Sequence, residues 1–149
     1  MKREVRFRLI RHLDFLENEL KDYERFKSLS WENYNNDRSC RRDVERWVEN
    51  IVNSSIDIAK IILMNEGITL PDTYRAIIKN LSIISDFKEL NTERLSQLVI
   101  LRNVIYYEYL DIRWSSIKKF ILETESLYRD LLNKVRSYIE RKIKEEGEE

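Results

Sequence analysis

The sequence predicts an all-α protein, an antiparallel up-and-down helical bundle of four long helices and one short one. Only two glycines and one proline occur among its 149 residues, whereas a sheet-rich chain places turn-forming residues roughly every eight to twelve positions. Apolar side chains recur at steps of three and four over long stretches, as on one face of a helix. A chain of this length buries about two-thirds of its unfolded surface, so we expect a single domain over residues 1–149.

The first long helix is expected over residues 3–28, followed by a loop. Its apolar stripe comprises Val5, Leu9, Leu13, Leu16 and Leu20. His12, the only histidine, lies beside this stripe, either as a boundary residue on the helix surface or as a catalytic histidine. Residues 29–37 lose the periodicity and are rich in Ser, Asn and Asp, which predicts a loop. We expect Trp31 and Tyr34 to fold back from it onto the bundle.

The second long helix is expected over residues 38–66. Asp37 or Ser39 can accept hydrogen bonds from the free amides at its start, and Gly67 can end it in the left-handed conformation. The predicted buried stripe comprises Cys40, Val44, Trp47, Ile51, Ile58 and Ile62. Several arginines near its start form either a solvated face with ion pairs along the helix or a patch that contacts phosphate.

The remaining elements are a short helix and two long ones. Pro71 suits the first turn of a short helix that ends near Asn80. After a break over residues 85–90, Asn91 or Thr92 is expected to cap the next helix, which bends near Asp111 into a last helix over residues 112–144. Residues 145–149 are expected to form a charged, disordered tail.

Composition restricts the classes of function. The chain has 27 basic and 27 acidic residues, so any contact with nucleic acid must come from a local arrangement of charges. No apolar run approaches the roughly 18 residues of a membrane helix, and the opening MKREVRF is no secretory signal, so we expect a cytoplasmic protein without membrane contact. One cysteine and one histidine leave no ligand set for zinc, and neither a metal nor another cofactor is expected.

A polar cluster interrupts the apolar stretch LVILRNVIYYEYLDIR at residues 98–113. Since successive helix residues turn by about 100°, Arg102, Tyr106 and Tyr109 lie on one stripe, and Asn103 and Tyr107 on a neighbouring one. Arg102 and Tyr107 then point about 140° apart, so one straight helix does not bring both to the same atom. A second copy of the chain would supply the missing partner, and we expect a homodimer with a shared site.

This cluster resembles the signature of the HEPN domains, and within them of the HepT-like toxins encoded beside a minimal nucleotidyltransferase. The signature is an arginine, a polar residue that is usually asparagine, three further residues, a histidine, any residue and a tyrosine. Arg102, Asn103 and Tyr109 match it, whereas Tyr107 stands at the histidine position. The order of the segments, including RRDVERWVENIVNSSIDIAKIIL and LPDTYRAIIKNL, is similar to the HepT-like pattern over most of the chain.

The resemblance implies a HEPN-like bundle and metal-independent cleavage of RNA, in which a ribose 2′-hydroxyl attacks the adjacent phosphate at a dimeric cleft. By that resemblance Arg102 binds the phosphate, Asn103 hydrogen-bonds the substrate, and Tyr107 replaces the histidine that moves protons. An unperturbed phenol has a pKa of about 10, and a positioned acid–base group contributes about 10²–10⁴-fold. We therefore expect weakened cleavage or none.

Tyr109 matches the tyrosine to which the partner nucleotidyltransferase attaches AMP in HepT-like toxins. The resemblance thus implies Tyr109 as a modification site, with Tyr106 lining the same site. If RNA is the substrate, Arg41 and Arg42 of the second helix are possible contacts. The alternative is that these tyrosines only line a dimer interface, where tyrosine is common.

The function predicted from the sequence is a HepT-like toxin of a toxin–antitoxin pair, an endoribonuclease with a nucleotidyltransferase antitoxin as its partner. One alternative is a non-catalytic HEPN subunit that holds a nucleotide or substrate for a separate nucleotidyltransferase. The other is a structural helical dimer.

Overall fold

The computed structural model describes residues 1–147, and all regular structure within this range is helical. The α-helices are α1 (Arg3–Leu20), α2 (Tyr23–Phe26), α3 (Trp31–Asn36), α4 (Arg38–Asn65), α5 (Tyr74–Lys79), α6 (Thr92–Gln97), α7 (Leu101–Tyr107), α8 (Leu110–Glu123) and α9 (Glu125–Gly147). Three short 3₁₀ helices are η1 (Asn80–Ile83), η2 (Ser85–Phe87) and η3 (Leu98–Ile100). The predicted all-α class is confirmed. Within the described range no helix is both long and apolar enough to cross a membrane.

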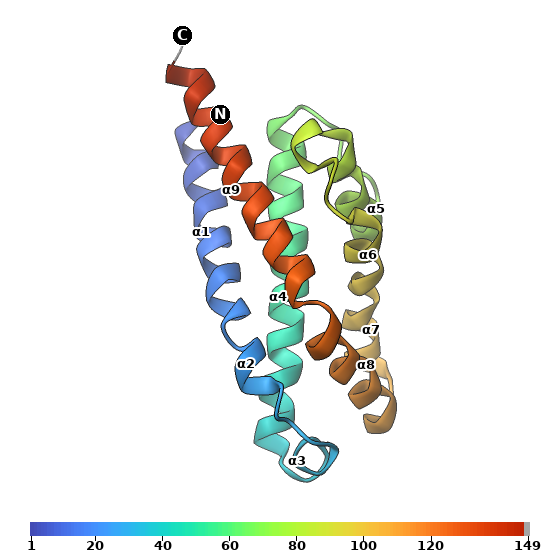
Figure 1. Ribbon diagram of the computed structural model, residues 1–149. Helices are drawn as coiled ribbons and strands as arrows, with labels where there is room; N and C mark the ends of the chain where they lie inside the picture. Colours follow the sequence, from blue (N-terminus) through green and yellow to red (C-terminus); the bar gives the residue numbers. More distant parts are fainter. Residues whose placement is uncertain (148–149) are drawn as a thin grey trace.

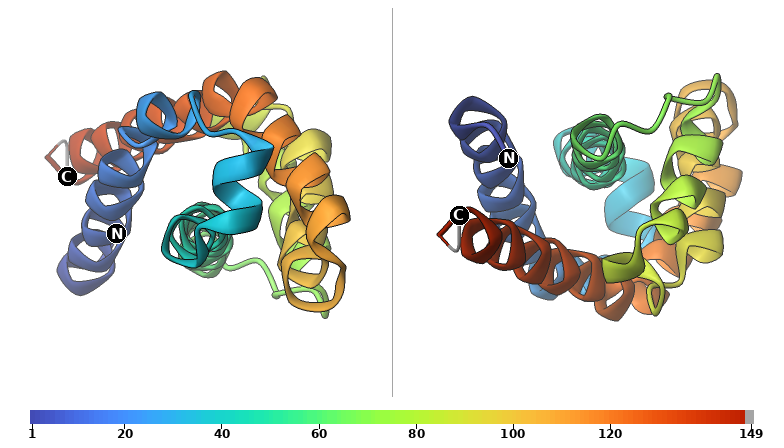
Figure 2. Two further views of the ribbon diagram at one scale, coloured as in Figure 1. Left: turned by 90° about the horizontal axis from the view of Figure 1, so that it is seen from below. Right: turned by 90° about the horizontal axis from the view of Figure 1, so that it is seen from above.

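Helix α4 is the centre of the bundle. Seen along its axis, α1, α9, α8 and the segment from α5 to α7 form an arc around it (Figure 2), and α4 contacts α1, α3, α5, α7 and α8. Along the chain α1 runs down, α4 runs up, the segment from α5 to α7 runs down and α9 runs up (Figure 1). This is the antiparallel up-and-down order that the sequence predicts.

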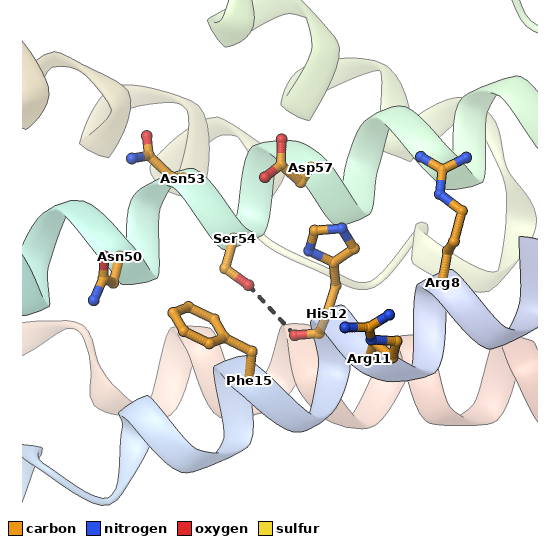
Figure 3. A pocket seen from close by; sticks show the side chains of 8 residues that line it. All are labelled: Arg8, Arg11, His12, Phe15, Asn50, Asn53, Ser54 and Asp57. Carbon is orange, nitrogen blue, oxygen red and sulfur yellow. Dashed lines mark hydrogen bonds between the residues drawn. The ribbon is translucent and has the colours of Figure 1, made fainter.

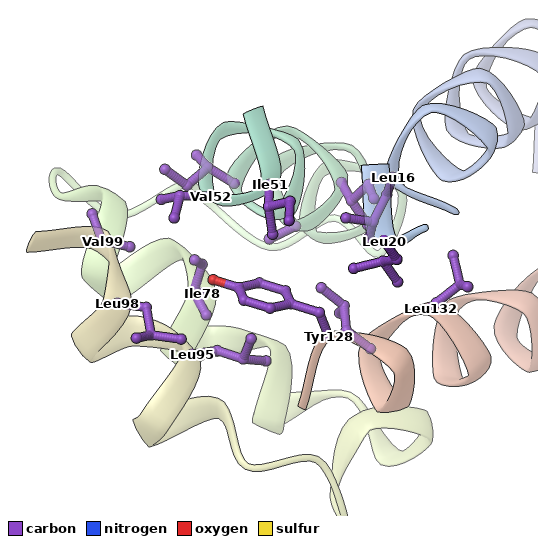
Figure 4. Close-up of a cluster of buried hydrophobic side chains, with 14 of the residues drawn as sticks. Leu16, Leu20, Ile51, Val52, Ile78, Leu95, Leu98, Val99, Tyr128 and Leu132 are labelled. Carbon is purple, nitrogen blue, oxygen red and sulfur yellow. The ribbon is translucent and has the colours of Figure 1, made fainter. Parts of the chain in front are cut away.

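One connected core of buried apolar side chains fills the space between the helices. The predicted stripe of α4 is buried at Val44, Trp47, Ile51, Ile58 and Ile62, while Cys40 is only partly buried. Figure 4 shows the ring of Tyr128, from α9, among apolar side chains of α4, α5 and α6. The core thus joins the two halves of the chain through α4.

The ends of α4 are those that the sequence predicts. Asp37 Oδ1 accepts hydrogen bonds from the backbone amides of Ser39 and Cys40, both at 3.1 Å. Gly67 has a φ of 71°, in the left-handed region that favours glycine after a helix. The expected cap of the motif segment is also confirmed, because Asn91 Oδ1 accepts from the Arg94 amide at 3.1 Å.

The predicted loop at residues 29–37 is wrong over most of its length, because Trp31–Asn36 form helix α3. Ser30 Oγ caps this helix by accepting from the Asn33 amide at 3.1 Å. Tyr34 is fully buried, with its ring 5.2 Å from that of Trp114 between centroids, as expected. Trp31 keeps part of its surface exposed.

Several expected helices are shorter than predicted. The first ends at Leu20, and the short helix begins at Tyr74, after Pro71. The motif segment ends at Tyr107 rather than bending near Asp111, because Glu108 and the following residue are extended, with ψ of 162° and 160°. The last helix is divided at Thr124. The Oγ1 of this threonine donates to the carbonyl of Phe120 at 2.6 Å, a bond that commonly bends helices.

The charged tail is shorter than expected, since residues 145–147 continue α9. Glu145 pairs with Arg141 one turn earlier. Glu146 pairs with the amino group of Met1 and lies 3.5 Å from Arg6. These contacts stabilise the last turn against α1, whereas residues 148 and 149 of the predicted tail lie outside the described residues.

Candidate functional site

Helix α7 turns the polar motif away from the core. Leu101 and Ile105, four residues apart, are buried, whereas Arg102 is half-buried and Asn103 is exposed. The 3₁₀ turn η3 precedes α7, and the extended Glu108 follows it. The buried side therefore fixes a short helix whose polar side stays open.

The motif side chains border a hollow of about 500 Å³, which we call the motif hollow. Its walls come from α4, α5, η3 and α7. The lining residues are Glu49, Asn53, Tyr74, Val99, Arg102, Asn103, Tyr106 and Tyr107. Of the predicted site residues, Arg102, Asn103, Tyr106 and Tyr107 thus meet within one chain.

Arg102 and Tyr107 were expected to point about 140° apart, and both lie within the unbroken helix α7. They nevertheless border the same space. Both side chains line the motif hollow, because the long guanidinium side chain of Arg102 reaches a space that Tyr107 borders from the end of the helix. Helix geometry alone therefore gives no reason for a second chain, and a homodimer needs separate support.

Arg102 is held from the opposite wall by Tyr74. Its Cζ lies 4.9 Å from the centroid of the Tyr74 ring, and Lys60 Nζ lies 4.8 Å from the same centroid. A cation over an aromatic face gains about 0.5–1 kcal/mol at an exposed site. Among residues 1–147 Arg102 forms no ion pair, so its guanidinium is positioned by an aromatic ring and its N–H donors remain available to an anion.

Glu49 is the only carboxyl group among the described residues of the motif hollow. Burial raises its pKa, the nearby Glu45 carboxylate raises it further, and Arg102 and Arg46 act in the opposite direction. Glu45 itself is engaged, because it pairs with Arg113 at 3.3 Å and accepts from the Tyr34 hydroxyl at 2.5 Å. The hollow therefore contains one carboxyl group that is easier to protonate than usual.

Tyr106 and Tyr107 form the mouth of the motif hollow. They are 74% and 78% exposed, and their ring centroids are 5.1 Å apart with an angle of 61° between the planes. Their hydroxyl groups are thus accessible from solvent and can donate hydrogen bonds to an anion seated near Arg102.

A second hollow of about 560 Å³ lies between α1 and α4 (Figure 3), and we call it the α1–α4 hollow. The α1 side supplies Arg8, Arg11 and His12. The imidazole of His12 points toward Asp57 of α4 (Figure 3), and its backbone carbonyl accepts from Ser54 Oγ at 3.5 Å. The histidine lines this hollow and not the motif hollow.

The two hollows adjoin over α4. Asn53 lines both of them. A smaller hollow of about 210 Å³ lies beside Asn53 and is also bordered by Asp57, Lys60, Tyr74 and Arg102. A polar surface therefore extends from the motif residues across α4 to the arginines of α1. Within the described part of the chain, no group of three or more His, Cys, Asp or Glu side chains is arranged to hold a metal ion.

Comparison with known protein families gives a match over most of the chain. The family described as Ribonuclease HepT-like matches residues 16–138. This chain belongs to the HepT-like ribonuclease family. All lining residues of the motif hollow in this HepT-like protein fall inside the matched range, whereas Arg8, Arg11 and His12 precede it. Comparisons with curated proteins and with solved structures gave no match.

Tyr109 of this HepT-like protein lies outside the motif hollow. It is 83% exposed and precedes α8 in an extended conformation. Beyond this break, Arg113 of α8 donates from Nε to the Glu108 carbonyl at 2.7 Å. The break after α7 therefore separates Tyr109 from the other motif residues.

Arg41 and Arg42 are not brought to either hollow. Arg41 donates to the backbone carbonyls of Tyr34 and Asn35, at 3.2 and 3.0 Å. These carbonyls belong to the last residues of α3, so Arg41 stabilises that helix end. Arg42 is exposed.

Sequence reasoning missed four residues that line the motif hollow, Glu49, Asn53, Tyr74 and Val99. The spacing of Glu49 and Asn53, four residues apart on α4, shows that both lie on one face. The sequence does not show which helix that face meets. The contact of Tyr74 with Arg102 depends on how α5 lies beside α7, which the sequence does not show.

Proposed function

We propose that this HepT-like protein is a metal-independent endoribonuclease that acts in the cytoplasm as the toxin of a toxin–antitoxin pair. The observation that carries this proposal is that Arg102, Asn103 and Tyr107 border one open hollow within a chain of the HepT-like ribonuclease family. An unpaired guanidinium, an amide and a phenol together suit a phosphate group. RNA is the substrate class that this family implies.

Each motif residue has a definite role in this proposal. Arg102 binds the scissile phosphate and stabilises the charge that grows as the 2′-hydroxyl attacks. Asn103 donates a hydrogen bond from its side-chain amide to the substrate. Tyr107, exposed at the mouth, donates a proton to the leaving 5′ oxygen.

In this proposal the bound RNA strand extends from the motif hollow across Asn53 into the α1–α4 hollow. Arg8 and Arg11 lie there within reach of backbone phosphates, and among the described residues neither of them forms an ion pair. A chain with no net charge needs such a local group of cations to hold a polyanion.

Tyr109 is the proposed site at which a partner nucleotidyltransferase attaches AMP. Its high exposure and the extended backbone around it support this assignment, because a modifying enzyme must reach the hydroxyl. The adduct is bulky and anionic. Next to α7 it repels RNA from the mouth of the motif hollow.

Removal of the Arg102 guanidinium tests the proposal. We expect Arg102→Ala to lower the rate of cleavage of single-stranded RNA in the presence of EDTA by at least about 100-fold, the usual cost of one donor to a developing charge. Arg38→Ala, which removes an exposed arginine at the start of α4 outside both hollows, should cleave as the wild type does. Full activity of Arg102→Ala would contradict the proposal.

Restoring histidine at position 107 is a second test. If the site is otherwise intact, Tyr107→His should raise the rate of RNA cleavage above that of the wild type. A positioned acid–base group contributes roughly 10²–10⁴-fold, which is the upper limit of the expected gain. An unchanged rate would indicate that the motif hollow does not hold the scissile phosphate.

The tyrosine at position 107 favours one alternative, a non-catalytic HEPN subunit that binds a nucleotide or substrate for a separate nucleotidyltransferase. In that case the wild type does not cleave RNA, yet it binds nucleotide in a manner that depends on Arg102. Tolerance of Arg102→Ala in both assays would leave the structural helical dimer.

A further inference from the structure

The motif hollow contains a candidate proton acceptor in place of the expected histidine. Attack by a 2′-hydroxyl requires a group that takes its proton, and a phenol is mostly protonated at neutral pH. The titratable side chains that border the hollow are Glu49, Arg102 and the tyrosines 74, 106 and 107. Of these, only the carboxylate of Glu49 is both abundant at neutral pH and able to accept a proton.

The position of Glu49 is suitable for this task. It lies on α4, one turn before Asn53, and both side chains line the hollow on the wall opposite α7. It is partly buried, and among residues 1–147 its carboxylate takes part in no side-chain hydrogen bond or ion pair. A partly buried carboxylate with a structural role is normally paired. Glu45, one turn before Glu49 on α4, is paired in this way with Arg113.

The surroundings of Glu49 make its carboxylate a stronger base than that of a solvent-exposed glutamate. The charged groups that act on Glu49 are Glu45, Arg46 and Arg102. Tyr74 and the two tyrosines at the mouth line the same hollow. Burial is the largest influence and raises the pKa of Glu49, with Glu45 adding to it against Arg102 and Arg46. A raised pKa makes a carboxylate a stronger base while it remains largely ionised.

We propose that Glu49 is the general base of the cleavage reaction and takes over the proton-accepting role of the absent histidine. In this step, the Glu49 carboxylate takes the proton of the 2′-hydroxyl, and the 2′ oxygen forms a bond to phosphorus. The bond between phosphorus and the 5′ oxygen breaks, and that oxygen takes a proton from Tyr107 or water. The products are a 2′,3′-cyclic phosphate and a 5′-hydroxyl end. This inference rests on the proposed ribonuclease function.

The decisive variant is Glu49→Gln, which keeps the size and polarity of the side chain but cannot accept the proton. We expect kcat to fall by about 100-fold or more, while binding of a non-cleavable 2′-O-methyl RNA stays within about twofold. In the wild type, we expect the rate to rise with pH on the acid side of the profile as Glu49 ionises. This rise should be absent from Glu49→Gln. Glu89→Gln, at an exposed glutamate outside the hollows, is the matched control and should keep the wild-type profile.

A double variant separates a general base from a residue that only positions Arg102. In Tyr107→His the new imidazole supplies a base, so adding Glu49→Gln should cost far less than it does in the wild-type background. Equal losses in both backgrounds, or a loss of RNA binding that matches the loss of rate, would overturn the proposal. So would an unchanged pH–rate profile in Glu49→Gln. If the wild type binds RNA but does not cleave it, both the proposed nuclease and the role of Glu49 are wrong. If the wild type cleaves RNA and Glu49→Gln cleaves equally well, only the role of Glu49 is wrong.

Discussion

Two buried tyrosines differ in what their hydroxyl groups meet. The hydroxyl of Tyr23 donates to Thr124 Oγ1 at 2.6 Å, and Thr124 in turn donates to the carbonyl of Phe120. This chain of bonds links α2 to the division between α8 and α9. The hydroxyl of Tyr128, fully buried in the core, has no hydrogen-bond partner among the described residues. A buried polar group without a partner costs about 1–3 kcal/mol.

Replacing each tyrosine by phenylalanine should therefore have opposite effects. We expect Tyr128→Phe to raise the free energy of unfolding by about 1 kcal/mol, because it removes an unsatisfied hydroxyl. Tyr23→Phe should lower it by about 1 kcal/mol, because it breaks one buried bond. Urea unfolding of the two variants beside the wild type measures both. Destabilisation by Tyr128→Phe would show that its hydroxyl has a partner in solution.

At the scale of single residues, the sequence identified those whose role follows from local chemistry. Asp37 and Gly67 delimit α4 as predicted because capping and left-handed φ depend on neighbours along the chain. Arg102 and Tyr107 were also identified, through the motif. Glu49 was not, because its importance comes from a helix that lies about fifty residues later in the chain.

At the scale of elements, the apolar stripes predicted the helices but not their interruptions. The extended Glu108 ends α7 although nothing in its residue type requires a break, and only tertiary packing decides it. The consequence for the site is large, since this break separates Tyr109 from the motif hollow. Helix α3 was missed for the opposite reason, because a polar sequence became helical once Tyr34 was buried and Arg41 bonded its last carbonyls.

The α1–α4 hollow supports a prediction for strand binding. Substituting both Arg8 and Arg11 by alanine should weaken binding of a 2′-O-methyl oligonucleotide and reduce the slope of log K against log salt by about 1.4, since each phosphate contact of a single strand contributes roughly 0.7. Cleavage of a dinucleotide, which is too short to leave the motif hollow, should be unchanged. The exposed pair Lys118 and Lys119 of α8, likewise changed to alanine, is the control. An unchanged salt slope would exclude the α1 arginines from the RNA path.

At the scale of the whole molecule, we propose a homodimer formed through α7 and its neighbours. Ile100, Tyr106, Tyr107 and Tyr109 leave large apolar or aromatic surfaces exposed within one short stretch. Aromatic residues of this kind are enriched in protein interfaces. A partner there would also narrow the mouth of the motif hollow and restrict access of water.

Sedimentation equilibrium tests this assembly directly. We expect a mass twice the 18.2 kDa of the chain, and we expect Ile100→Glu to shift the equilibrium toward the monomer. Ile143→Glu, at a similarly exposed isoleucine near the end of α9, should leave the dimer intact. A monomeric wild type at the concentrations used for the cleavage assay would contradict a dimeric site.

Helix α4 contributes both to the core and to the hollows, and this restricts which parts of the sequence can change during evolution. One side of the helix fills the core, and another supplies Glu49, Asn53 and Asp57 to the floor of the hollows, so the positions on these two sides tolerate few replacements. The rims of the hollows are formed by α1, α5 and α7, whose outward side chains contribute less to the core. We expect evolutionary divergence to concentrate on these rims, altering which substrates the hollows admit, while the core-facing and hollow-facing positions of α4 stay nearly constant.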